Sequence, residues 1–307
     1  MTAPRPGRRV LAPRNAPSVR TPRLAAAVER ILARVATQVD DAIQATHPSA
    51  EDLHQLHRGF RRLRLGIELW VRVLPARDRE VGLPLERRTK RLARLVGEVR
   101  DRDIVLALFE EVPGAGARPE ETEEFHRFLA RLRDDARTGR ELLRASLRTE
   151  RDAGLFVEIR SLLERTPSPR GASELRTLIS GESGAHHARV RRAHRKASRR
   201  PTAERLHRLR IRLRQLRHAN ELIRLVDPRA TLRIPNSFRR LQDHIGQLHD
   251  MDVALATLDP DLERSPWADR LRRRRRRARL GVRAELERLA LPPDRPAAPI
   301  ARSGGSA

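Results

Sequence analysis

The chain has 307 residues, of which 38% are hydrophobic and 35% are charged. This length allows two domains of about 130 residues each. The 66 Lys and Arg residues outnumber the 40 Asp and Glu residues, and the formal net charge of +26 attracts polyanions without specifying which one. The absence of cysteine excludes disulfides, thiolate metal sites and cysteine catalysis.

The chain shows no targeting or membrane-spanning segment. No apolar run approaches the roughly 18 residues that a membrane span needs, and the basic N-terminus lacks the apolar segment of a secretory signal. We therefore expect a cytoplasmic protein without a membrane partner.

The first half of the chain is predicted to form a four-helix bundle over residues 21–150. Residues 1–20 are rich in Pro and Arg without periodicity, which predicts a disordered basic tail. Thr21-Pro22 has the pattern of an N-cap followed by a first helical residue, and a loop is predicted from Pro75 to Pro84. The predicted helices cover 21–46, 50–74, 85–112 and 119–150.

The second half is predicted to repeat this plan over residues 182–290. A connector over 151–181 contains a short apolar helix near 152–165 and a break at Pro167–Gly171. The tail over 291–307 is predicted to be flexible. No segment shows the sustained alternation of a strand, so the fold class is all-α, with two tandem four-helix bundles. The predicted helices of the second bundle cover 183–199, 202–226, 235–258 and 267–290.

The segments 53–69 and 206–222 carry the same pattern of leucine, histidine and arginine. On a helix of about 100° per residue, their basic residues form one stripe and their leucines form the adjoining stripe. The basic stripe therefore lies on the shoulder of the core, where long arginines can hold their charged groups in a groove. Arg62 falls off this stripe and is expected on ordinary surface. The stripes contain His54, His57, Arg61 and Arg64 in the first copy and His207, Arg210, Arg214 and Arg217 in the second.

A second repeated pattern follows each stripe. Gly97 and Gly246 occupy matching places in it, and because glycine inside a helix costs about 1 kcal/mol relative to alanine, they predict a close helix–helix approach. The Asp-x-Asp pairs at 101–103 and 250–252 could orient arginines, cap a neighbouring helix or face water. The cationic residues of this pattern that are predicted to line the groove are Lys90, Arg91, Arg100, Arg239, Arg240 and His249.

These motifs resemble those of the CHAD family, the histidine-containing α-helical domains. Both copies show His-x-x-basic-x-x-x-Arg-x-x-Arg followed by Gly-x-x-Arg/His-Asp-x-Asp, so the resemblance covers roughly residues 20–290 and makes 21–290 one CHAD domain. It implies two four-helix bundles related by a pseudo-twofold axis, with a basic groove that binds inorganic polyphosphate. The first copy departs from the pattern at His57-Arg58-Gly59, where the family usually has Arg followed by small apolar residues. No triphosphate-processing motif precedes residue 50, so we expect no catalytic partner domain.

The density of basic residues supports a bound anion. Residues 186–217 contain 13 Arg or Lys and one acidic residue, Glu204. Like charges four residues apart destabilise a helix by a few tenths of a kcal/mol, which an anion would relieve; the alternative is a solvated surface. His54 and His207 could donate to phosphate when protonated or hydrogen-bond to a neighbouring helix. Because no Ser/His/Asp or paired-carboxylate arrangement repeats, we expect binding without catalysis.

Nonspecific nucleic-acid binding is the main alternative. The Arg272–Arg277 run covers every side of its helix and could contact any phosphate backbone. Aromatic residues make up only 3% of the chain and tyrosine is absent, which leaves few platforms for stacked bases. We therefore expect weak nucleic-acid binding beside polyphosphate binding. The polyphosphate binding would serve either targeting to polyphosphate granules or regulation of polyphosphate metabolism, and the sequence does not separate these two roles.

A di-metal helical bundle is the second alternative. The Glu-x-x-His spacing of such sites occurs at 51–54, 123–126 and 204–207. Glu51 and Glu204, however, lie in the first turns of their helices, where the helix dipole already favours acids. Because their histidines also begin an arginine stripe, we expect no metal or other cofactor.

Overall fold

The computed structural model describes residues 21–45, 48–112, 117–226 and 236–289. Within these ranges every regular element is a helix, which confirms the all-α prediction. The predicted tails, 1–20 and 291–307, lie outside the described residues. The helices are α1 (Thr21–Gln44), α2 (Ala50–Val73), α3 (Ala76–Glu110), α4 (Pro119–Asp152), α5 (Leu155–Leu163), α6 (Pro169–Arg199), α7 (Ala203–Val226), α8 (Asn236–Thr257), the 3-10 helix η1 (Pro260–Leu262) and α9 (Pro266–Arg288).

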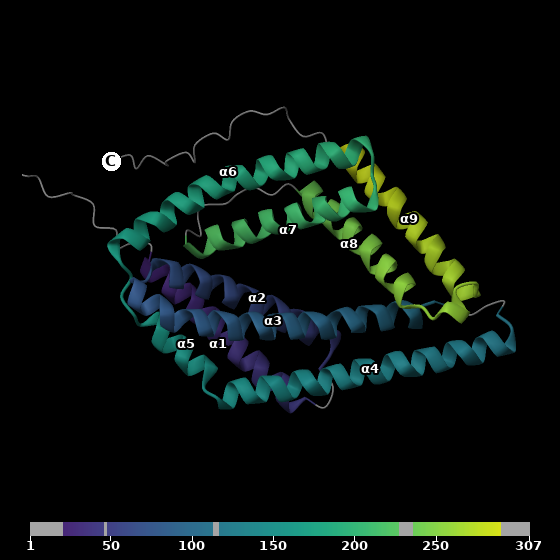
Figure 1. Ribbon diagram of the computed structural model, residues 1–307, viewed down its shortest axis with the longest axis horizontal. Helices are drawn as coiled ribbons and strands as arrows, with labels where there is room; N and C mark the ends of the chain where they lie inside the picture. Colours follow the sequence, from purple (N-terminus) through teal and green to yellow (C-terminus); the bar gives the residue numbers. More distant parts are fainter. Residues whose placement is uncertain (1–20, 46–47, 113–116, 227–235, 290–307) are drawn as a thin grey trace, which may run out of the picture.

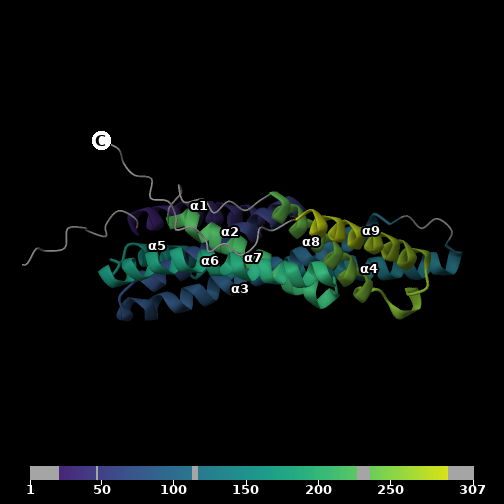
Figure 2. The same cartoon turned by 90° about the horizontal axis from the view of Figure 1, so that it is seen from above.

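The helices form an elongated and rather thin assembly. In Figure 1, α2 and α3 lie side by side near the middle, α4 runs along the lower edge, and α6 runs along the upper edge with α7 beneath it. The view turned by 90° in Figure 2 shows how shallow the assembly is in the third direction. None of the described helices is long and apolar enough to cross a bilayer.

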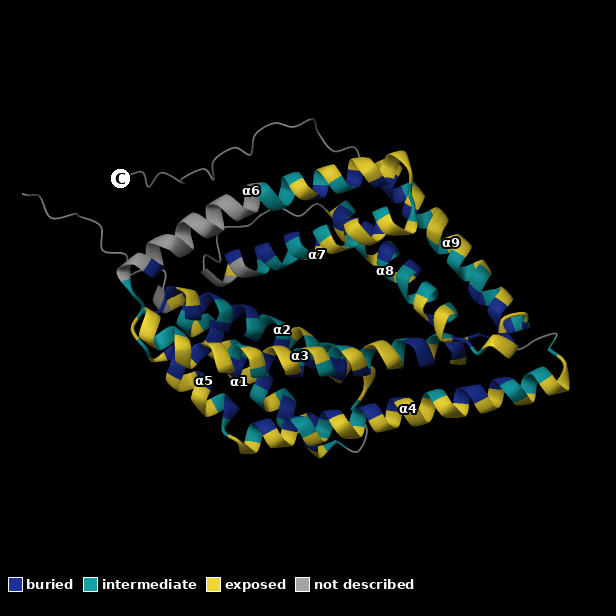
Figure 3. Cartoon of the chain, in the orientation of Figure 1, coloured by how far each residue is buried: buried dark blue, intermediate teal, exposed yellow. Residues whose placement is uncertain are grey.

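Three apolar clusters hold the helices together. The first joins α1, α2, α3 and α5 with the end of α4, and the third joins α6, α7, α8 and α9. The middle cluster combines the end of α3 and the start of α4 with the end of α8 and the start of α9. In it, Trp267 stacks on Phe125 with ring centroids 4.1 Å apart. The two halves of the chain therefore share a core. Figure 3 shows the buried residues in dark blue along the helices of both halves.

Helix α3 begins earlier than predicted, because the segment from Pro75 to Pro84 is helical rather than a loop. Proline inside a helix removes one backbone hydrogen bond, and tertiary contacts compensate for that loss here. Arg79 Nε donates to the Leu74 carbonyl at 2.8 Å. A Cβ on Gly82 would lie 2.4 Å from Val71 Cγ2, so this turn packs tightly against α2.

Helix α6 also begins earlier, at Pro169, and runs through the boundary predicted at residue 181. The predicted break at Pro167–Gly171 is instead a helix start, since Ser168 Oγ accepts from the Gly171 N–H at 3.0 Å and proline occupies the first turn. The Ser168 N–H donates to the Val73 carbonyl at 2.9 Å, which ties this start to the end of α2.

The prediction that Gly97 and Gly246 mark close helix contacts was wrong. A Cβ on Gly97 would meet nothing nearer than His57 Nε2 at 3.6 Å, and one on Gly246 would meet nothing within 4 Å. Close helix approaches occur at glycines outside this pattern, such as Gly59 of α2, where a Cβ would lie 2.7 Å from Gln38 Oε1 of α1. A glycine repeated in both copies therefore does not itself indicate a packing constraint.

Candidate functional site

An open cleft lies between α2 and α3 of the first half and α7 and α8 of the second half. The space within it is about 1620 Å³. Its lining includes four carboxylates, namely Asp101, Glu221, Asp243 and Asp250. Two histidines, His54 and His57, also line it. The carboxylates are outnumbered by seven arginines, namely Arg58, Arg61, Arg62, Arg100, Arg210, Arg214 and Arg217.

The cleft is built from the repeated stripes. In α2 the apolar residues Leu53, Leu56 and Phe60 are buried, and in α7 Leu209 and Leu213 are buried in the same register. Because the basic stripe adjoins each apolar stripe, burying the leucines turns both basic stripes toward the space between the halves. The sequence-predicted residues that meet there are His54, His57, Arg61, Arg100, Arg210, Arg214 and Arg217.

Sequence reasoning missed Arg58 and Arg62, of which Arg62 was expected on ordinary surface. On the helical wheel Arg58 lies about 60° and Arg62 about 100° from Arg61, at the edge of the stripe. Their long side chains nevertheless reach the lining of the cleft. The basic surface of α2 in the cleft is therefore wider than the stripe formed by the repeated residues alone.

An ion pair crosses the cleft between the two halves. Arg61 Nη2 donates to Glu221 Oε1 at 2.8 Å and to Oε2 at 2.9 Å. This contact joins α2 to α7 and neutralises one of the seven arginines. The Nε of Arg61 is buried and has no partner among the described residues.

Arg100, Arg210, Arg214 and Arg217 form no ion pair with any residue that the structure describes. Burial lowers the pKa of Arg214, and the neighbouring guanidinium group of Arg210 lowers it further. Burial also lowers the pKa of Arg217, with a further contribution from Arg61. Both pKa values are lowered chiefly because burial disfavours the charged form, and an anion bound in the cleft would counteract this effect.

The cleft histidines are held neutral. Burial lowers the pKa of His57 to about 4, with further contributions from Arg100 and Arg61. Burial also lowers the pKa of His54, again assisted by Arg100. At neutral pH both rings are therefore uncharged, and they can donate to an anion only through a neutral N–H group.

His218 is a further histidine of this region that sequence reasoning missed. Burial lowers its pKa to about 3, and Arg61, Arg217 and Arg214 add to the effect. It lies about 20° from His207 on the helical wheel, just beyond the edge of the basic stripe that faces away from the leucines, and this nearness to the stripe is the signal that could have found it. The first copy has Leu65 at the equivalent place, so the residue does not repeat.

In both Asp-x-Asp pairs the first aspartate lines the cleft and the second binds an arginine of another helix. Asp103 accepts from Arg140 at 2.5 Å, and Asp252 accepts from Arg275 at 2.5 Å, each on the following helix of its half. The first residue of each pair, Asp101 or Asp250, lines the cleft. The sequence allowed these aspartates to orient arginines, cap a neighbouring helix or face water. The structure shows that the second aspartate of each pair binds an arginine.

His207 and His249 lie in a smaller adjoining pocket of about 530 Å³. Their ring centroids are 6.5 Å apart. Arg275 and Arg279 of α9 also line this pocket. Arg210 lines both spaces, so the pocket extends the cleft toward α9.

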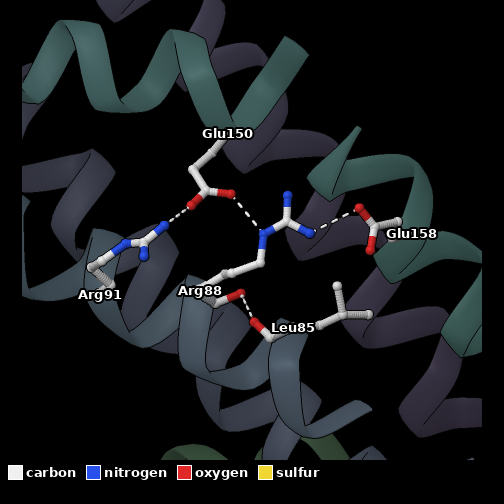
Figure 4. Close-up of polar contacts among 6 residues, drawn as sticks. Leu85, Arg88, Arg91, Glu150 and Glu158 are labelled. Atoms are coloured by element: carbon white, nitrogen blue, oxygen red, sulfur yellow. Dashed lines mark hydrogen bonds and ion pairs between the residues drawn. The ribbon is translucent and has the colours of Figure 1, made fainter. Parts of the chain in front are cut away.

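The other predicted site residues do not line the cleft. Arg64 pairs with Glu68 at 3.6 Å within α2. Arg91 pairs with the buried Glu150, which also accepts from Arg88, as Figure 4 shows. Arg240 lies 3.5 Å from Glu285 in an ion pair, and Lys90 and Arg239 are exposed.

The residues of the di-metal alternative do not come together. Glu51 and Glu204 are exposed, and Glu204 pairs with Arg208. Within the described residues no group of three or more His, Asp or Glu side chains is arranged to hold a metal ion. Glu51 and Glu204 lie in the first turns of α2 and α7, where the helix dipole favours acids.

The model of the CHAD domain family matches residues 26–259. The chain belongs to the CHAD family. Comparison with curated proteins finds no match. Among solved structures, the CHAD domain from the plant Ricinus communis is 20% identical, with a TM-score of 0.58, and the alignment covers 94% of this chain and 98% of that one. PptA from Streptomyces chartreusis is 14% identical, with a TM-score of 0.55, and 87% of this chain and 99% of that one are covered. At these identities the two structures support the CHAD fold alone.

Proposed function

We propose that this CHAD protein binds inorganic polyphosphate in the cleft, without catalysing its turnover. The observation that carries the proposal is the meeting of seven arginines from both halves in one open space. Four of them, Arg100, Arg210, Arg214 and Arg217, lack a carboxylate partner among the described residues. Arginines such as Arg88, Arg140 and Arg275 each pair with a carboxylate, whereas in the cleft seven arginines face four carboxylates, so positive charge is in excess there.

The chemistry of the lining favours polyphosphate over nucleic acid. Polyphosphate presents one charge per internal phosphate and no bases, and the forked guanidinium group matches phosphate oxygens. The lining contains histidines but no Phe, Tyr or Trp on which bases could stack. Each charge-assisted hydrogen bond contributes about 1.5–3 kcal/mol, so a few of them suffice for tight, salt-sensitive binding.

We further propose that the two halves are related by a pseudo-twofold axis through the cleft, as tandem bundles joined by the middle cluster. The equivalent stripes of α2 and α7 both line the cleft, and the equivalent aspartates, Asp103 and Asp252, pair with the following helix in each half. A symmetric trough would present similar cations along both sides of a linear polymer. Binding of this kind suits attachment to polyphosphate granules or regulation of enzymes that handle the polymer.

A competition assay with matched variants tests the proposal. Labelled long-chain polyphosphate is bound to the protein and challenged with equal charge equivalents of duplex DNA or RNA. The Arg214→Ala, Arg217→Ala variant should lose at least about tenfold in polyphosphate affinity, since two charge-assisted contacts are removed. The control, Arg273→Ala with Arg277→Ala, removes the same charge from exposed positions of α9 and should change affinity less than threefold.

Three outcomes would contradict the proposal. Equal losses in the two variants would show that net charge rather than the cleft determines binding. Displacement by nucleic acid at equal charge would favour the nucleic-acid alternative. Release of orthophosphate that disappears in a cleft variant would overturn binding without catalysis.

A further inference from the structure

A second basic groove lies on the outer side of the α6–α7 pair. We call it the outer groove. Four of its cations come from α6, namely Arg189, Arg192, Lys196 and Arg199, and three come from α7, namely Arg205, Arg208 and Arg212. Glu204 is the single carboxylate in its lining, and the space within it is about 1680 Å³. The outer groove is therefore as large as the cleft and has a lower share of acidic residues.

Most of the positive charge in the outer groove has no carboxylate partner among the residues that the structure describes. Arg208 pairs with Glu204, while Arg205 donates to the Lys196 carbonyl at 3.1 Å and Arg212 donates to Gln215 Oε1 at 2.8 Å. The four α6 cations form no ion pair with any described residue, and all four are exposed. The like charges along this face repel one another, and a bound anion would relieve that repulsion.

The outer groove and the cleft lie on opposite sides of α7. On the helical wheel Arg208 and Arg212 lie about 160° and 200° from Arg210, whereas Arg214 and Arg217 lie within about 40° of it. In Figure 1 the end of α6 runs along the upper edge of the molecule, on the side of α7 away from α2 and α3, and Figure 3 shows that this part is largely accessible. A short linear polymer in the cleft therefore cannot contact the outer groove at the same time.

The arrangement of the cations suits a single narrow strand. The two rows belong to consecutive helices joined by a short turn, and packed helices have axes about 8–10 Å apart. Because both rows line one groove, a chain lying between them can contact guanidinium groups on each side. No aromatic residue lines the groove, so it offers no surface for stacked bases. A polyphosphate chain fits these features better than a nucleic acid does.

We propose that the outer groove is a second polyphosphate-binding site, so that one protein molecule holds two chains or two distant stretches of one chain. This inference rests on the proposed function, because the cleft is taken as the first site. Two sites on opposite sides of α7 would allow the protein to cross-link polymer chains.

The test counts the chains bound by each protein molecule. Calorimetric titration with polyphosphate chains too short to span both sites is carried out on the full chain and on three variants. The outer-groove variant is Arg192→Ala with Arg199→Ala, the cleft variant is Arg214→Ala with Arg217→Ala, and the matched control is Arg273→Ala with Arg277→Ala. Energy transfer between donor-labelled and acceptor-labelled long chains then reports cross-linking, and circular dichroism confirms that each variant is folded.

We expect two short chains per subunit for the unmodified protein and for the control, and one for each of the other variants. Energy transfer should fall at least about fivefold in the outer-groove variant, which should keep its cleft affinity. A stoichiometry of one per subunit in the unmodified protein, or of two in the outer-groove variant, would overturn this inference and leave the proposed function standing.

The remaining outcomes separate the two sites and the two ligands. Full binding by the cleft variant together with none by the outer-groove variant would instead overturn the proposed function of the cleft. Duplex DNA that displaces only the outer chain, at equal charge equivalents, would show that the outer groove prefers nucleic acid and would also overturn the inference.

Discussion

At the scale of single residues, the protonation of the cleft histidines follows from their surroundings. His57 and His218 are withdrawn from water and lie among guanidinium groups, and both effects disfavour a positive ring. His207, in contrast, is exposed beside the smaller pocket. The histidines of this region therefore differ in their environments, and burial is the main cause of the lowered pKa values of His57 and His218.

The depressed pKa of His218 predicts an acid sensitivity of the unliganded protein. Its pKa is about 3 in the folded state against 6.5 for an ordinary histidine, so between these two values the unfolded chain binds a proton that the folded chain does not. Stability is therefore fully present above pH 6.5 and is lost as the pH falls. In denaturant titrations between pH 6.5 and 4, His218→Gln should make this loss shallower by up to about 1.4 kcal/mol per pH unit.

The control for this prediction is His126→Gln, because His126 is exposed on α4. The control should follow the unmodified protein at every pH. An unchanged pH dependence in the His218 variant would show that this ring is not kept neutral by the fold.

The residue scale also shows where sequence reasoning reached its limit. Helical periodicity brought Arg61, Arg214 and Arg217 onto one face, and the structure places them in one cleft. The same reasoning could not show that Arg91 is engaged by the buried Glu150, because that carboxylate lies on another helix far along the chain. It likewise missed His218, since only one of the two copies carries it.

At the scale of elements, helix starts depend on contacts as much as on local signals. Proline at 75 and 84 suggested a loop, yet α3 begins at Ala76 because Arg79 and Gly82 fasten its first turns to α2 and α5. The start of α6 has a sound local signal in Ser168, but the hydrogen bond from Ser168 to Val73 adds a tertiary anchor. Proline at 75 and 84 therefore does not exclude a helix over this segment.

Two glycines in helices should respond oppositely to alanine. A Cβ on Gly171 would lie 2.4 Å from the Val73 carbonyl oxygen, and backbone cannot easily move away, so Gly171→Ala should lower the unfolding free energy by about 1–3 kcal/mol. A Cβ on Gly246 would enter open space, so Gly246→Ala should raise it by up to about 1 kcal/mol. Urea titrations of the two variants measure both effects. A large destabilisation by Gly246→Ala would contradict the open space around Gly246 and would support the close helix contact expected from the sequence.

At the scale of the whole molecule, the middle cluster decides how the halves behave. Phe109 and Phe125 of the first half pack with Trp267 and Leu271 of the second half. The Arg61–Glu221 ion pair adds a second link, across the cleft. The two sides of the cleft are thus joined by contacts that belong to neither half alone.

The shared core predicts that the two halves unfold together. Trp70 lies in the first cluster and Trp267 in the middle cluster, so the variants Trp267→Phe and Trp70→Phe each leave one fluorescent reporter. In each variant the fluorescence transition in denaturant should coincide with the loss of helical circular dichroism. Two separated transitions would show that the middle cluster does not couple the halves. Trp267→Ala should cost about 3–5 kcal/mol and, by weakening this cluster, could separate them.

The sequence by itself determined the helical class, the two repeated stripes and the family to which they belong, because helical periodicity is a local property that neighbouring residues specify. Only the tertiary structure decided which stripes meet. It brought α2 and α7 to one cleft, paired Arg91 and Arg240 with carboxylates instead, and opened a second basic groove on the far side of α7. The physical reason is that ion pairs and burial depend on residues distant along the chain, whose positions follow from how the three apolar clusters pack.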